Sequence, residues 1–139
     1  MAGTTLNKSS ILNTFNEHFF EFIEDIILII EDNNEIKYAR DFFKNIKNIN
    51  SSSILKAWYY YVYLPYTEQI DKGDISYFLD KNYNNDLKVF ESTSNQKQII
   101  DVIDKLREPI KNMSIENIKH STEYIQNLSK LSKIYISLM

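Results

Sequence analysis

Apolar residues recur along the chain at intervals of three and four positions, the spacing of one helix face. Near the start of the chain this spacing predicts a helix from about residue 9 or 10 to residue 31, with a buried seam at Leu12, Phe15, Phe19, Phe22, Ile26 and Ile29. A second seam lies one position along, at Phe20, Ile23, Ile27 and Ile30. Two adjacent seams make a wide apolar face, so we expect this helix to pack against two or more partners.

The same periodicity predicts a helix over residues 34–49, whose core positions are Ile36, Ala39, Phe42, Phe43, Ile46 and Ile49. It also predicts a last helix that follows Ser114 as N-cap, with a buried side at Ile118, Ile125, Leu128, Leu131, Tyr135 and Leu138. A further helix is expected from about residue 95, with a break ahead of Pro109 and a seam at Ile99, Ile103, Leu106, Ile110 and Met113.

Residues 54–72 combine helical spacing of apolar residues with a central run of strong strand propensity. Helix is favoured, because the chain contains no second strand-like run that could pair with this one. Pro65 is expected to kink or restart the helix, since proline has no N–H to donate to the carbonyl of Tyr61. Gly73 is predicted to end it as the residue just past the C-cap, and a short helix is expected over residues 75–79.

These elements predict an all-α fold: a single domain over residues 1–139, built as a compact bundle of five or six largely antiparallel helices. Residues 1–8 are expected to be flexible, and the longest loop is expected at about residues 80–95. The most apolar run, residues 26–30, is too short to span a bilayer, so the sequence predicts a soluble protein with no membrane span.

Composition excludes several classes of function. The chain of 139 residues has 2 Gly and no Cys, which leaves no dinucleotide-binding or P-loop glycine motif, no disulfide and no thiolate metal site. No catalytic constellation is present either, so we expect a protein that is not an enzyme and has no cofactor. The net charge of −3 and the scarcity of Arg disfavour nucleic-acid binding, which draws its affinity from contacts of Lys and Arg with phosphate.

Charge is unevenly distributed along the chain. Seven acidic residues and no Lys or Arg occur from Ser9 to Ile36, whereas Lys105 to Met139 contains six basic and three acidic residues. This asymmetry favours side-by-side packing of the first and last helices, and two separately solvated faces are the alternative. The two histidines, His18 and His120, lack the Glu-x-x-His spacing of helical metal sites, and His120 shares a face with Glu116 four positions earlier.

Aromatic residues crowd into one short segment, whose members are Trp58, Tyr59, Tyr60, Tyr61, Tyr63 and Tyr66. One helix face cannot bury all six, and exposed Tyr and Trp provide rigid contact area that protein interfaces favour. The segment is therefore a candidate partner-binding surface. The alternative is that half of these residues belong to the core while the others extend their hydroxyls to water.

A weak alternative site is a calcium loop. Asp80, Asn82, Asn84, Asp86 and Glu91 occupy positions 1, 3, 5, 7 and 12 of the EF-hand pattern. However, Asn85 replaces the glycine that the turn requires, and Lys88 places a positive charge beside the expected ligands. No metal site is favoured.

Two stretches carry a family resemblance. The first spans residues 61–79, with Tyr61, Tyr63, Pro65, Tyr66, Gln69, Ile70, Gly73, Asp74, Tyr77, Phe78 and Leu79; the second is DKLREPIKNMS at 104–114, followed by Glu116 and Asn117. Together with the helix from Phe15 to Ile26, they resemble an uncharacterised family of small helical proteins of nucleocytoplasmic large DNA viruses, the giant and algal viruses. The resemblance implies a viral protein in the host cytoplasm, the viral factory or the virion, and it assigns no activity.

The sequence therefore predicts a non-enzymatic protein-interaction or structural module that binds a protein partner or self-associates. Two alternatives stay open: an accessory subunit of a larger enzyme or of a transcription or replication complex, and a weak calcium-responsive binder through residues 80–91.

Overall fold

The computed structural model describes residues 7–30, 34–75, 102 and 105–139, and these residues contain helices and turns but no strand. The predicted all-α class is confirmed. The α-helices are α1 (Lys8–Ile29), α2 (Asn34–Ile49), α3 (Ser53–Ala57), α4 (Thr67–Asp71), α8 (Arg107–Lys111) and α9 (Ile115–Ser137). A π-helix (Trp58–Tyr63) and a 3₁₀-helix (Leu64–Tyr66) join α3 to α4.

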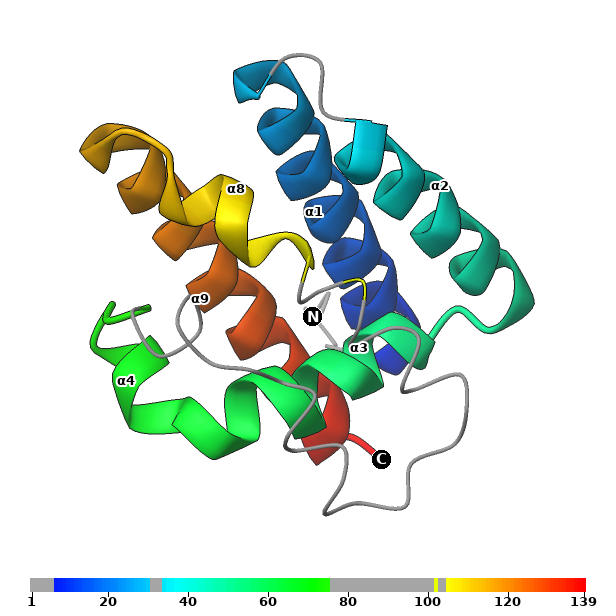
Figure 1. Cartoon of the computed structure of the whole chain (residues 1–139). Coiled ribbons are helices and arrows are strands. Elements are labelled where there is room, and N and C mark those ends of the chain that lie inside the picture. Colours follow the sequence, from blue (N-terminus) through cyan, green and yellow to red (C-terminus); the bar gives the residue numbers. More distant parts are fainter. Residues whose placement is uncertain (1–6, 31–33, 76–101, 103–104) are drawn as a thin grey trace, which may run out of the picture.

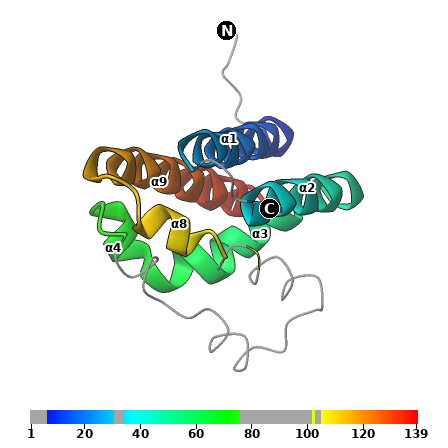
Figure 2. The ribbon, with the colours of Figure 1, turned by 45° about the horizontal axis from the view of Figure 1, so that its top comes forward.

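Helix α1 packs against both α2 and α9, which run antiparallel to it (Figure 1). Figure 2 shows three levels: α1 on one side, α9 and α2 in the middle, and α3, α4 and α8 on the other side. The segment from α3 to α4 runs obliquely across α9 (Figure 1). As a result, the outer side of α1 and the adjoining side of α9 form one face of the molecule, away from α3 and α4.

The core is rich in aromatic rings contributed by different helices. Phe19 of α1 lies at its centre and is fully buried. Its ring meets that of Phe43 edge-on at a centroid distance of 4.8 Å and that of Trp58 at 6.3 Å. Helix α9 adds Ile125 and Leu128, so α1, α2, the π-helix and α9 share one apolar core.

Helix boundaries agree closely with the sequence prediction, while burial at the helix ends does not. Helix α2 has the predicted bounds, and α1 begins at Lys8 because the Asn7 side chain accepts a hydrogen bond from the Ser10 N–H at 2.8 Å. Asn7 and Lys8 therefore belong to the helix and its cap, while residues 1–6 of the expected flexible segment lie outside the described residues. Three predicted core positions are exposed instead: Ile29, Ile49 and Leu138. Each occupies the last turn of its helix or follows it, where the described part of the chain leaves the continued seam partly uncovered.

The helix predicted over residues 54–72 is present, but the chain passes from α-helix to π-helix to 3₁₀-helix and back to α-helix where a simple kink was expected. Within the π-helix the N–H groups reach back five residues, as Leu64 does to the Tyr59 carbonyl. Pro65 has no N–H to continue this pattern, and the chain tightens into the 3₁₀-helix that contains it. The Thr67 hydroxyl lies 3.2 Å from the carbonyl oxygens of both Tyr63 and Leu64, to which it donates at the start of α4.

Two predicted caps are confirmed. Ser114 caps α9 by accepting a hydrogen bond from the Asn117 N–H at 3.2 Å. Gly73 follows α4 with φ of 81°, and the Gly73 and Asp74 N–H groups close a Schellman motif on the carbonyls of Ile70 and Gln69. This left-handed conformation is one that side chains with a Cβ adopt at a cost, which explains glycine at this position.

The predicted side-by-side packing of α1 and α9 is observed, and its basis is apolar. Phe22 and Ile26 of α1 and Ile125 of α9 are buried, and no ion pair joins the two helices among the described residues. Burial of apolar area, and not attraction between oppositely charged faces, therefore holds this pair together. None of the described helices combines the length and the apolarity that crossing a bilayer requires.

Candidate functional site

Two adjoining hollows lie between α1 and α9, and we call them together the α1/α9 groove. The apolar hollow has a volume of about 290 Å³, with Phe22, Ile26, Leu28 and Ile29 of α1 facing α9 residues that include Ser121. The polar hollow, of about 250 Å³, is lined by His18, Glu123 and Asn127 together with residues common to both. The shared residues are Asp25, His120 and Tyr124, so the two hollows have part of their walls in common.

Tyr124 is the central residue of the groove. Its half-buried ring stacks on Phe22 at a centroid distance of 5.1 Å and lies tilted against the ring of His18 at 4.7 Å. Its hydroxyl donates a 2.8 Å hydrogen bond to Oδ2 of Asp25. Burial, followed by the hydrogen bond and the negative charge of Asp25, raises the pKa of Tyr124 to about 12. The hydroxyl is therefore a fixed donor at neutral pH.

Each histidine pairs with a carboxylate on its own helix. Nδ1 of His18 lies 3.5 Å from Oε2 of Glu21, and Nδ1 of His120 lies 3.9 Å from Oε2 of Glu123. His120 thus pairs with the residue three positions later, and not with Glu116. Over the described residues, no three His, Asp or Glu side chains come together as a metal would require.

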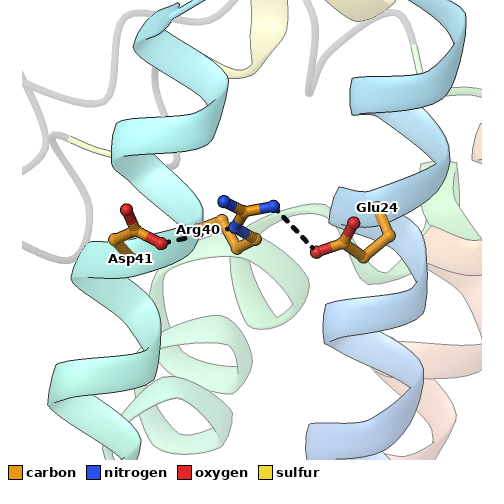
Figure 3. Close-up of polar contacts among 3 residues, drawn as sticks. All are labelled: Glu24, Arg40 and Asp41. Atoms are coloured by element: carbon orange, nitrogen blue, oxygen red, sulfur yellow. Dashed lines mark hydrogen bonds and ion pairs between the residues drawn. The ribbon is translucent and has the colours of Figure 1, made fainter.

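Acidic side chains continue from the groove over the outer side of α1. A broad, shallow hollow of about 640 Å³ there is lined by Glu17, Glu21, Glu24 and Asp25, with Lys44 of α2 at its far side. Glu24 is neutralised by Arg40, whose Nη1 lies 3.3 Å from its Oε1, while Nε of Arg40 contacts Asp41 at 3.3 Å (Figure 3). Arg40 therefore acts on the side of α1 that faces α2, whereas Lys44 shares the shallow hollow with Asp25 and with Tyr124 of α9.

The aromatic segment chosen from the sequence is divided between core and surface. Trp58, Tyr63 and Tyr66 are buried, which removes them from any contact with a partner in this conformation. Tyr63 donates a hydrogen bond to Asp71 at 3.1 Å, and burial and this partner raise its pKa to about 12. Tyr59 and Tyr61 are half-buried, and Tyr60, at 45% exposed, is the most accessible of the six. The alternative that half of the residues are core describes the segment better than a fully exposed surface.

The five candidate calcium ligands, Asp80, Asn82, Asn84, Asp86 and Glu91, lie outside the described residues. The same is true of the predicted helix at 75–79 beyond Ile75, and of Ile99 and Ile103.

Sequence reasoning missed the groove, and one signal could have indicated it. Ile29 lies on a predicted core seam, yet it is 41% exposed, and Leu28 beside it is 75% exposed. Leu28 belongs to neither of the two apolar seams of the helix, so its position already indicated an outward side chain. Asp25 and Tyr124 gave no such signal, because they are distant in sequence and ordinary in their local patterns.

Comparison of the chain with models of protein families, with curated proteins and with solved structures gives no match. The fold and the groove thus define a class only: an all-α domain with a part-apolar, part-acidic groove between its two longest described helices.

The raised pKa of Tyr124 predicts a stability change in alkaline solution. A pKa of about 12 in the folded chain, against an ordinary value of 10.0, means that the folded state holds this proton more tightly than the unfolded state. The stability linked to that proton is present below pH 10 and is lost as the pH rises toward 12. We expect the urea midpoint to fall over this range, and to fall less steeply in Tyr124→Phe. Tyr38→Phe, which removes an exposed tyrosine, should retain the wild-type slope. Equal slopes in all three proteins would contradict the assignment.

Proposed function

We propose that this chain is a non-enzymatic protein-interaction module whose α1/α9 groove binds a segment of another protein. The observation that carries the proposal is the pair of exposed apolar side chains, Leu28 and Ile29, beside an apolar hollow of about 290 Å³. Single exposed apolar residues are common on protein surfaces. Neighbouring ones that border a hollow are typical of binding sites, because water leaves such a surface favourably when a partner covers it.

The setting we propose is the one that the family resemblance implies, a large DNA virus whose protein acts in the host cytoplasm, the viral factory or the virion. An accessory role beside a catalytic chain is one form of the same function, since the groove would then receive part of that chain. In either case binding is the activity, and the side chains of the groove supply contact area and charge.

The test is affinity purification of the tagged chain from cells that express it, quantified by mass spectrometry. Leu28→Asp places a charge at the edge of the apolar hollow, and because Leu28 is 75% exposed, the fold does not depend on it. We expect at least one partner to be depleted by roughly tenfold, the effect of losing about 1.4 kcal/mol of binding free energy.

Two control variants locate the effect. Ile49→Asp makes the same kind of change at an 80% exposed position at the end of α2, and Tyr60→Ser alters the most accessible aromatic residue of the segment 58–66. Both should retain the partner that Leu28→Asp loses. If all three variants retain every partner, the groove is not the binding site; if only Tyr60→Ser loses the partner, the aromatic segment is.

A further inference from the structure

We infer that the α1/α9 groove takes a cationic amphipathic helix of a partner protein, with an apolar side chain in the apolar hollow and a Lys or Arg in the polar hollow. The inference rests on the proposed function and specifies the chemistry of its partner. Size, charge and the form of the groove walls each support it.

The apolar hollow is of a size that suits side chains of a protein. Its volume of about 290 Å³ is at the lower limit of the roughly 300–1,000 Å³ of small-molecule sites. Phe22, Ile26 and Ile29 line it from one side, and the ring of Tyr124 closes it toward the polar hollow. A large aliphatic or aromatic side chain entering from a partner would therefore lose its contact with water against mainly apolar walls.

Two carboxylates give the polar hollow negative charge, and one of them, Glu123, lies 3.9 Å from Nδ1 of His120. Asp25 of α1 and Glu123 of α9 line it from opposite helices, and neither hollow is lined by Lys or Arg. Asp25 accepts the Tyr124 hydrogen bond through Oδ2, and an ionised carboxylate has a second acceptor oxygen, Oδ1. Arg40, on the other side of α1, is bound to Glu24 and Asp41 (Figure 3). A guanidinium or ammonium group is the complement of two such carboxylates.

The form of the groove favours a helix as the occupant. Its walls are two antiparallel helices, and the described residues offer no strand edge to which an extended peptide could add. The two hollows share Asp25, His120 and Tyr124, so one helix can place an apolar side chain in the first hollow and a cation in the second. An anionic surface, whether nucleic acid or membrane, would instead be repelled by the carboxylates.

The probes are three labelled synthetic peptides of about 18 residues, roughly five helical turns. The first places leucines on one face of a helix and lysines on the rest. The second has glutamate in place of every lysine, and the third has the composition of the first in an order without an apolar face. Binding to the intact chain is measured by fluorescence anisotropy near physiological salt, about 0.15 M. We expect the first peptide to bind at least about tenfold more tightly than either of the others.

Variants of the chain separate a specific groove from general attraction to an acidic protein. Leu28→Asp adds a negative charge, so general attraction would strengthen binding, whereas the inferred site requires a loss of about tenfold. Glu123→Gln should weaken the lysine peptide several-fold, and Glu68→Gln, which removes an exposed carboxylate on α4, should leave it unchanged. Equal affinity for the lysine and glutamate peptides, tighter binding by Leu28→Asp, or equal effects of Glu123→Gln and Glu68→Gln would each overturn the inference.

Sedimentation of the chain alone tests whether a second copy of this chain occupies the groove. Self-association that Leu28→Asp abolishes would identify a second copy in the groove and overturn the inference of a separate cationic helix.

The proposed function and the inferred partner chemistry can also fail independently of each other. If purification shows partners that depend on Leu28 and the lysine peptide does not bind, the proposed function stands and the partner chemistry is wrong. If the peptide binds as expected and no cellular partner depends on Leu28, the proposed function is wrong.

Discussion

Replacing Phe19 with alanine is expected to lower the free energy of unfolding by about 3–5 kcal/mol, the range for deleting a buried phenyl ring. Phe19 is fully buried, and its ring lies against four others: those of Phe15 and Phe20 on the same helix, of Phe43 of α2 and of Trp58 of the π-helix. Whole domains are stable by only about 5–15 kcal/mol, so this single change removes a large share of the total. Urea unfolding followed by circular dichroism measures the loss.

Phe20→Ala is the matched control for that experiment. Phe20 is the next residue on the same helix and is only partly buried, with Nζ of Lys47 5.6 Å from its ring centroid. Truncating it leaves a site open to water in place of a closed cavity, so we expect less than half the loss seen for Phe19→Ala. A loss at Phe20 equal to that at Phe19 would mean that Phe19 is not the centre of the core.

Ser129→Leu is expected to cost about 2–5 kcal/mol, through overpacking together with the loss of a buried hydrogen-bond acceptor. Ser129 of α9 is fully buried, and its Oγ accepts a hydrogen bond from Nε1 of Trp58 at 3.0 Å. Ser132, also buried, donates to the Ser129 carbonyl at 2.7 Å. These small side chains allow the π-helix to pack closely on α9, and a leucine side chain would force them apart.

Ser129→Ala separates the two contributions. It removes the hydroxyl and adds no volume, so it should cost only about 1–2 kcal/mol. Since Trp58 is the only tryptophan of the chain, its fluorescence reports the environment of this contact directly. We expect a clear red shift for Ser129→Leu in the folded protein and little change for Ser129→Ala. Equal losses of stability in the two variants would show that close packing at Ser129 has no part in the fold.

The features of the fold that the sequence predicted correctly depend on interactions between residues close together in the chain. The bounds of α2, the Ser114 cap and the Gly73 turn all depend on residues within a few positions of one another, and all three predictions were correct. Where prediction failed, the deciding contact was distant. The exposure of Ile49 and the burial of Tyr66 depend on which other segments of the chain pack beside them.

The sequence by itself determined an all-helical protein, because apolar spacing, caps and the scarcity of glycine are local properties that favour helix over strand. It also excluded thiol, disulfide and glycine-loop chemistry. Only the tertiary structure decided where a partner can bind. The groove exists because α1 and α9 pack side by side, which joins Tyr124 to Asp25 across 99 positions of sequence and leaves Leu28 uncovered. The spacing of apolar residues along one helix indicates that one of its faces is buried. Which residues of that face are covered depends on the neighbouring helices.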